Sequence, residues 1–384
     1  MARTAARRQV ERVTPLELFF DLVFVLAITQ CTALMVAEHS WAGLAKGLLV
    51  LAALWWSWVG YAWLTSVVDP EEGAVRLAIF AAMGAFLVLA LAIPEAFGDQ
   101  GVTFAVAYAV VRFAQVALFL VASREDPSLR RSVITGLAGS TTVGVGLLAV
   151  ASQLDGAAQG GLWLAAILLD VAGPYFFGSE GWELVPDHFA ERHGLIVIVA
   201  LGESIVALGA GAEAGLDAGV ITAAAVGVAL AALMWWLYFD AVTILTAQHL
   251  VAAPTGKEQN ELARDCYSLL HFPMIAGIVL VAVGLHETLA HVDEPLKVEV
   301  AGAALLGGLG LYLLGHVAFA WRDHGTIKTV RLVGAAATVA LLPLASEVSA
   351  LATTAAAAVV LGVLVVYETL RYSEDRARIR HGER

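Results

Sequence analysis

Charged residues are scarce in this sequence, and their scarcity excludes most soluble folds. Asp, Glu, Lys and Arg make up 15% of the 384 residues, whereas hydrophobic residues make up 60%. Soluble domains are usually about one quarter charged and about half apolar. The mean hydropathy is +0.80, and the apolar residues form blocks of about 20 residues, the length that crosses about 30 Å of hydrocarbon. The sequence therefore predicts an all-α integral membrane protein that is embedded in a lipid bilayer.

Cysteine is nearly absent as well. The two cysteines, Cys31 and Cys266, fall in different apolar blocks, and the sequence has no CxxC pair or other zinc-binding spacing. The sequence also lacks the motifs of P-loop nucleotide binding, of HExxH metalloproteases and of GxSxG hydrolases. The formal net charge of −12 does not favour binding to nucleic acid, which is itself negatively charged. The sequence thus indicates no metal site and no nucleic-acid partner, and it identifies no cofactor.

Twelve apolar segments are long enough to be predicted membrane spans. Lys and Arg lie in the connections on the N-terminal side of the membrane, except for Lys46 and Lys297 on the opposite side and Arg112 within a span. Basic residues accumulate in cytoplasmic connections, so both termini are predicted to be cytoplasmic. The predicted spans are residues 16–37, 42–66, 75–95, 102–122, 132–152, 160–178, 190–210, 219–244, 267–288, 299–320, 327–346 and 350–371.

Two stretches of sequence recur in the same order. "LAALWWSWVGY" (51–61) resembles "LAALMWWLYFD" (230–240), and "FAAMGAFLVLALAIPE" (80–95) resembles "FPMIAGIVLVAVGLHE" (272–287). This pairing predicts two parallel six-helix repeats, residues 16–178 and 179–371, between a basic segment (1–15) and a charged tail (372–384). The alternative is chance similarity, which Ala- and Leu-rich sequence makes easy.

Three ionisable residues are predicted to lie near the middle of spans, where a charge costs a few kcal/mol and usually faces the protein interior. Arg112, Asp170 and Glu203 are expected at similar depths and would form a paired triad. One carboxylate of such a triad would hold a proton, because burial and a neighbouring negative charge both disfavour ionisation. With Asp21, these residues are predicted to line a cation or proton pathway. The alternative is a buried pair that only fixes helix register.

The first span begins with two carboxylates one turn apart. Thr14, Pro15 and Glu17 match a capping box with proline at the first helical position. Capping explains Glu17 about as well as function does. Asp21 lies past the capping turn on the same helix face, which favours a functional or pairing role for it.

Further polar and aromatic residues gather at the cytoplasmic ends of the predicted spans. One interpretation is a set of snorkelling side chains and an interfacial aromatic belt, which also covers Trp55, Trp56 and Trp235. Another is the active site of a membrane enzyme or a lipid-handling protein at headgroup level. At the outer end, His286, Glu287 and His291 are expected to be solvated rather than to bind a metal. The cytoplasmic-end residues are Glu17, Phe20, Glu191, Arg192, His193, Trp236, Tyr238, Asp240 and His271.

Three of these stretches resemble the bacterial low temperature requirement protein A family. They are "PLELFFDLVFVLAIT" (15–29), "ERHGLIVIVALGES" (191–204) and "WWLYFD" (235–240), in this order. The resemblance runs from about residue 10 to the C-terminus and implies a multi-pass protein of the bacterial inner membrane that is linked to growth in the cold. By position, the residues that the family motifs mark are Glu17, Phe20, Asp21, Glu191, Arg192, Gly202, Glu203, Trp236, Tyr238 and Asp240.

The first span is also similar to the pore helix of a lysosomal and bacterial potassium-channel family, in which an FSD motif precedes VFAIAIT. Phe20 replaces the serine of that motif, so the hydrogen-bonding role of the serine does not transfer. The leading hypothesis is a transporter or ion-conducting protein for a cation, a proton or a small solute. The alternative is an integral membrane enzyme or lipid-handling protein that acts at the cytoplasmic leaflet. The sequence does not indicate the oligomeric state.

Overall fold

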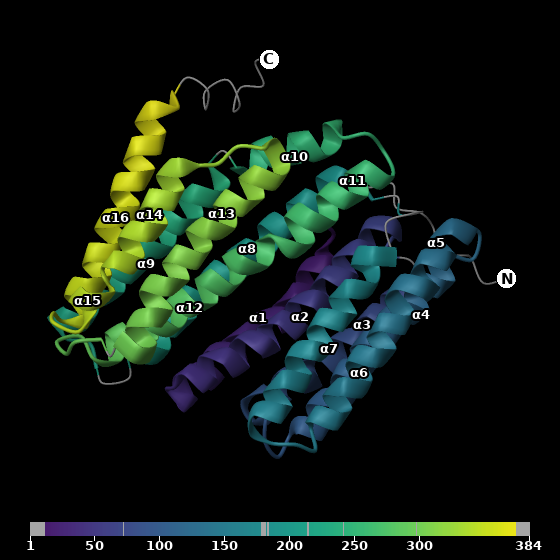
Figure 1. The fold of residues 1–384 in the computed structure, drawn as a ribbon, viewed down its shortest axis with the longest axis horizontal. Coiled ribbons are helices and arrows are strands. Elements are labelled where there is room, and N and C mark those ends of the chain that lie inside the picture. The colour runs from purple at the N-terminus through teal and green to yellow at the C-terminus, as the bar shows by residue number, and fades with distance from the viewer. Residues whose placement is uncertain are drawn as a thin grey trace. The chain divides into compact units, whose positions relative to one another are not determined.

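The computed structural model describes residues 12–71, 73–177, 182, 184–212, 215–240, 242–296 and 298–373. Every regular element in these ranges is a helix, and isolated backbone bridges, such as that between Pro295 and Ser349, form no strand (Figure 1). Within the described ranges, 11 helices are long and apolar enough to cross a membrane. The prediction of an all-α, multi-span membrane protein is confirmed.

The helices follow one another closely along the chain. The first are α1 (Pro15–Glu38), α2 (Trp41–Val67), α3 (Gly73–Ala92), η1 (Ile93–Glu95), α4 (Gly101–Ala122), α5 (Pro127–Ser132), η2 (Val133–Ala138), α6 (Gly139–Ala151), α7 (Gly156–Phe177) and α8 (Pro186–Gly211). The rest are α9 (Ala218–Phe239), α10 (Val242–Ala252), α11 (Lys257–Leu262), η3 (Ala263–Leu269), α12 (His271–Ala290), η4 (Val298–Gly307), α13 (Gly308–His324), α14 (Thr329–Ala340), α15 (Leu342–Ala345) and α16 (Ala350–Arg371).

One predicted span, residues 327–346, is shorter in the structure than expected. Its helix is interrupted at Leu341, between α14 and α15, and Pro343 stands in the first turn of α15. Proline has no backbone N–H, and its ring clashes with the carbonyl four residues earlier, so a regular helix does not continue through it. This segment is therefore a shorter apolar helix, and it is not among the 11 candidate spans of the described chain.

The described residues group into two compact units. Unit 1 contains the chain through Cys31, Lys46–Arg192 and Leu250–Arg264, and unit 2 contains Thr32–Ala45, His193–His249 and the chain from Asp265 onward. In unit 1, α3 packs against α4, and α6 packs against both α4 and α7. In unit 2, α12 packs against α13 and η4, α13 against α14, and α16 against α9. Helices α1 and α8 each contribute residues to both units.

Glycines allow α12 and α13 of unit 2 to approach closely. A Cβ atom on Gly277 would lie 2.6 Å from the carbonyl oxygen of Gly308, and one on Gly308 would lie 2.8 Å from that of Gly277. Both distances are shorter than carbon–oxygen contact permits. Small residues at such crossings bring helix backbones together in membranes, where packing replaces the hydrophobic effect between helices.

Candidate functional site

Four buried ionisable side chains meet in unit 1, where α1 and α8 begin. Glu17 Oε1 accepts a hydrogen bond from Arg192 Nη1 at 2.9 Å and lies 2.9 Å from His188 Nε2. Asp21 Oδ1 accepts a hydrogen bond from Arg192 Nη2 at 3.1 Å. All four residues are buried, and Asp21 is only 3% exposed. A single guanidinium group therefore bridges two carboxylates.

The spacing of these residues along their helices explains why they meet. Glu17 and Asp21 are four residues apart on α1, and His188 and Arg192 are four residues apart on α8. Residues at this spacing share one face of a helix. Pro186 opens α8, at a position where the missing N–H of proline costs no helical hydrogen bond. The basic pair therefore lies in the first two turns of α8.

Helix α2 supplies the polar groups around the cluster. Trp58 Nε1 donates to Asp21 Oδ1 at 2.8 Å, and Arg192 Nη1 donates to Thr65 Oγ1 at 2.8 Å. Ser66 Oγ lies 3.1 Å from His188 Nδ1, so both nitrogens of this imidazole have a polar neighbour. Sequence reasoning missed these α2 residues and His188. A signal for His188 was present, since it lies one turn before Arg192.

Aromatic rings cover the guanidinium group of Arg192. Its Cζ atom lies 5.9 Å from the ring centroid of Phe20 and 5.6 Å from that of Trp58. Cations are attracted to aromatic faces at such distances. The Phe20 ring also packs against Tyr61 at a centroid distance of 5.0 Å. Phe20 thus contributes an aromatic wall to the cluster.

Glu17 caps α1 and joins the cluster at the same time. Its Oε2 atom accepts hydrogen bonds from the backbone N and Oγ1 of Thr14, at 2.9 Å and 3.1 Å, and its backbone N donates to Thr14 Oγ1 at 3.4 Å. These are the reciprocal contacts of a capping box. The other carboxylate oxygen, Oε1, faces His188 and Arg192. The sequence left open whether Glu17 caps the helix or pairs with other residues. In the structure Oε2 caps α1 and Oε1 pairs with His188 and Arg192.

One oxygen of Asp21 has no hydrogen-bond donor in the described part of the chain. Trp58 and Arg192 both donate to Oδ1, whereas Oδ2 is buried without a partner there. An unsatisfied buried polar atom costs about 1–3 kcal/mol, and more when it is charged. A proton bound at Oδ2, or a cation beside it, would remove this penalty. The cluster therefore has the chemistry of a proton or cation site.

A second polar cluster in unit 1 contains the predicted intramembrane residues Arg112 and Asp170. Asp170 Oδ1 accepts hydrogen bonds from Arg112 Nη2 and Thr141 Oγ1, both at 2.9 Å, and Oδ2 accepts one from Tyr108 OH at 3.0 Å. Arg112 Nη1 also donates to Gln115 Oε1 at 2.5 Å. Arg112 and Asp170 thus form a one-to-one ion pair, and both carboxylate oxygens have donors.

Glu203 is buried in unit 2, on the later part of α8. Its predicted convergence with Arg112 and Asp170 stays a prediction. Among the predicted residues at the cytoplasmic ends, Glu191 is exposed, and its Oε2 atom accepts a hydrogen bond from the backbone N of Val13 at 3.0 Å.

The residues of unit 2 that the sequence predicted at cytoplasmic ends differ in burial. Tyr238, His271 and His193 are buried: Tyr238 OH lies 2.7 Å from His271 Nε2, and the ring centroids of His193 and His271 are 5.4 Å apart. Asp240 is also buried, whereas Trp236 is 41% exposed. Four of these residues are therefore interior, and only Trp236 is exposed.

The expectation of an aromatic belt fails for two of the tryptophans and stays a prediction for the others. Trp235 is 45% exposed, like its neighbour Trp236 and as a belt residue should be, but Trp55 and Trp56 are buried within unit 1. The ring of Trp55 stacks on that of Trp58 at a centroid distance of 5.2 Å. Trp55 and Trp56 therefore lie in the interior of unit 1, and their assignment to the belt is wrong.

The expectation of a solvated surface at the outer end is wrong for Glu287, which is only 5% exposed. Its Oε2 atom lies 3.1 Å from His39 Nε2 and 3.6 Å from His291 Nδ1, and its Oε1 atom lies 3.5 Å from His286 Nδ1. His39 follows the end of α1 and is distant in sequence, so the sequence pattern around Glu287 did not reveal it.

Comparison with known proteins identifies relatives of the chain. Residues 12–366 match the model of a family described as bacterial low temperature requirement A protein (LtrA). The chain is 30% identical to an uncharacterized protein of Rhizobium meliloti (strain 1021) over 364 residues, which cover 92% of this chain and 88% of the relative. No solved structure matches.

Proposed function

The chain belongs to the bacterial low temperature requirement A family, and from this premise we propose that it is a transporter or ion-conducting protein of the bacterial inner membrane. We place its proton or cation site at Glu17, Asp21, His188 and Arg192. Both the family match and the apolar helices support a multi-pass membrane protein. The observation that carries the proposal is the buried Oδ2 atom of Asp21, which accepts no hydrogen bond in the described chain.

The contacts of the cluster suggest how an ion would be bound and released. Arg192 is shared between Glu17 and Asp21, so a proton on Asp21 weakens one half of the bridge while Glu17 keeps the guanidinium group paired. His188 lies between Ser66 and Glu17, and an imidazole with polar neighbours on both nitrogens can pass a proton from one to the other. Ionisable residues in membrane spans commonly mark such pathways.

The remaining predicted residues receive separate roles in this proposal. The Arg112–Asp170 pair, with both carboxylate oxygens satisfied, is assigned to holding α4 and α7 in register. Glu203 remains a candidate ion-binding carboxylate of unit 2. The six-plus-six parallel repeat and two cytoplasmic termini belong to the proposal as well. An even number of crossings places both termini on one side, so the shorter helix Thr329–Ala345 would have to cross with the 11 longer ones.

Ion flux into proteoliposomes tests the proposal. The purified full-length chain is reconstituted, and proton, sodium and potassium fluxes are followed with ion-sensitive dyes under imposed gradients. Asp21→Asn keeps the size of the side chain and an acceptor for Trp58 and Arg192 but removes the titratable charge. We expect it to lower the flux at least tenfold.

The matched control for this experiment is Thr14→Val. It removes the hydroxyl group that contacts Glu17 Oε2 and leaves all four ionisable groups in place, so the flux should persist. Wild-type vesicles without flux of any of the three ions would contradict the transport function. An Asp21→Asn variant with wild-type flux would contradict the site.

A cavity in unit 2 favours the alternative, a lipid-handling protein or membrane enzyme. It has a volume of about 480 Å³, and its wall combines Lys328 and the ion pair of Arg331 with Glu368 with apolar residues such as Phe319 and Ile327. Such a wall suits an anionic amphiphile. Lipid that co-purifies with the protein in stoichiometric amount, together with absent ion flux, would favour this alternative.

A further inference from the structure

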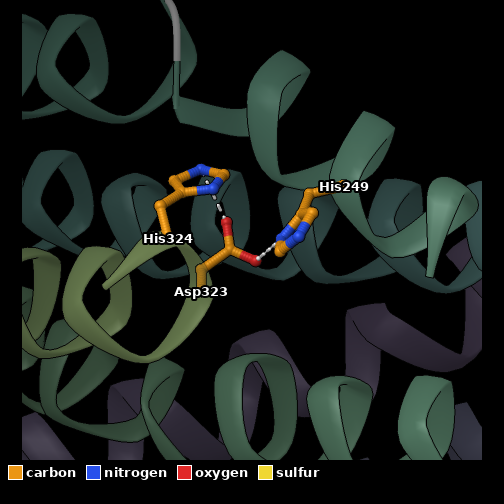
Figure 2. Close-up of side chains that lie close together, drawn as sticks. All are labelled: His249, Asp323 and His324. Atoms are coloured by element: carbon orange, nitrogen blue, oxygen red, sulfur yellow. Dashed lines mark hydrogen bonds and ion pairs between the residues drawn. The ribbon is translucent and has the colours of Figure 1, made fainter. Parts of the chain in front are cut away.

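A group of metal-ligating side chains lies in unit 2, apart from the residues assigned to ion transport. His249 lies near the end of α10, and Asp323 and His324 end α13. Each residue offers one ligand atom, and the three atoms lie within 4.8 Å of one another. Figure 2 shows the two imidazoles on either side of the carboxylate. We propose that His249, Asp323 and His324 bind a divalent transition-metal ion, with Zn²⁺ as the first candidate.

The buried carboxylate of Asp323 is the first argument for a ligand. Its side chain is 1% exposed, and His249 Nδ1 lies 2.7 Å from its Oδ1 atom. His324 Nε2 lies 2.8 Å from Oδ2, yet Oδ2 is buried and accepts no well-formed hydrogen bond in the described chain. Burying a carboxylate is costly unless it is paired or coordinates a metal. A cation between Asp323 and the two imidazoles supplies that compensation.

The donor set selects the class of metal. Two imidazole nitrogens and one carboxylate oxygen suit zinc and its neighbours in the first transition row, whereas Mg²⁺ and Ca²⁺ prefer oxygen ligands. Zinc bonds to these atoms are about 2.0–2.2 Å long, so ligand atoms around a tetrahedral ion are about 3.3 Å apart. The three atoms reach that spacing through side-chain adjustments on the order of 1 Å. His249 and His324 have exposed side-chain fractions of 43% and 31%, so solvent ions can reach them.

The neighbouring cavity gives a second, independent argument. His324 lines it together with His316. His316 is only 2% exposed, and neither of its ring nitrogens has a hydrogen-bond partner in the described chain. Unsatisfied buried nitrogens at a cavity wall point to a polar ligand in that cavity. Three protein ligands leave one position of a tetrahedral ion open, and that position would take water or an anionic group of a cavity ligand.

Metal binding to the full-length chain in detergent tests the proposal. The protein is stripped with a chelator, and Zn²⁺ binding is measured by calorimetry, while the visible absorption of bound Co²⁺ reports the ligand field. We expect one saturable site per chain. His249→Ala and His324→Ala should each weaken Zn²⁺ binding at least tenfold and alter the Co²⁺ spectrum. Asp323→Asn should act in the same direction.

The matched control is His291→Ala. This histidine is also exposed and also lies beside a buried carboxylate, Glu287, so its loss should leave the affinity and the Co²⁺ spectrum unchanged. Gel filtration checks that each variant stays monodisperse. If Asp323→Asn aggregates, the exposed His249 and His324 decide the result. Absence of saturable binding, wild-type affinity in both histidine variants, or equal weakening in His291→Ala would each overturn the proposal.

Discussion

Arg192 and Arg112 are both buried in unit 1, but they meet carboxylates in different numbers. Arg192 bridges Glu17 and Asp21 and leaves one oxygen of Asp21 without a donor in the described chain. Arg112 pairs with Asp170 alone, and donors from Thr141 and Tyr108 complete that carboxylate. Both oxygens of Asp170 already accept hydrogen bonds, whereas Oδ2 of Asp21 is still available to a proton or a cation. This contrast is the basis on which we assign the Arg112–Asp170 pair to helix register and the cluster around Arg192 to ion binding.

The largest effect on stability is expected from Asp170→Asn. It leaves the guanidinium group of Arg112 buried without its countercharge, and breaking a buried pair in this way costs about 3–5 kcal/mol of unfolding free energy. Thermal unfolding in detergent measures the loss. The double variant Arg112→Met with Asp170→Leu should recover part of it, since no buried charge remains. A wild-type unfolding midpoint in Asp170→Asn would show that the pair does not hold the helices.

An intermediate effect on stability is expected from Tyr108→Phe. This variant leaves Oδ2 of Asp170 without a donor, as Oδ2 of Asp21 already is in the described chain. The change removes the only donor to Asp170 Oδ2 that the described chain provides while the ring stays in place. Hydrogen bonds to charged groups contribute about 1.5–3 kcal/mol, so the midpoint of thermal unfolding should fall less than in Asp170→Asn. Ion flux should persist in this variant. A loss of flux comparable to that in Asp21→Asn would move the pathway to the Arg112–Asp170 pair.

The smallest effect on stability is expected from Asp21→Asn. Arg192 keeps Glu17 as its counterion, and the new amide can still accept from Trp58, so the loss should stay within about 1 kcal/mol. The same unfolding measurement applies, beside the flux assay in which this variant should fail. Destabilisation as large as that of Asp170→Asn would remove the distinction between the two clusters and indicate a structural role for both.

The sequence predicted the helices far better than it predicted the contacts between them. Span length and hydropathy located the segments because crossing hydrocarbon requires a long apolar run. The exception, residues 327–346, contains Pro343, which shortened the helix without interrupting the apolar pattern. Asp21 stood out because it lies past the capping turn, and this inference used only local geometry.

The partners of the site residues were harder to predict, because they are distant in sequence. Trp58 comes to Asp21 from α2, and its neighbours Trp55 and Trp56 looked like an interfacial belt. His249 and Asp323 are 74 positions apart, and His39 reaches Glu287 from the end of α1. Periodicity reports which residues share a helix face, but it does not report which face packs against which. Those pairings come from tertiary packing.

The double use of Glu17 has a mechanical consequence. One of its oxygens fastens the first turn of α1 through Thr14, and the other is held by His188 and Arg192. Both oxygens belong to one rigid, planar carboxylate group. If that group rotates so that one oxygen contacts a new partner, the hydrogen bonds of the other oxygen are weakened. Under the proposed function, a change of charge at His188 or Arg192 would therefore also change the hydrogen bonds between Glu17 and Thr14 that hold the first turn of α1.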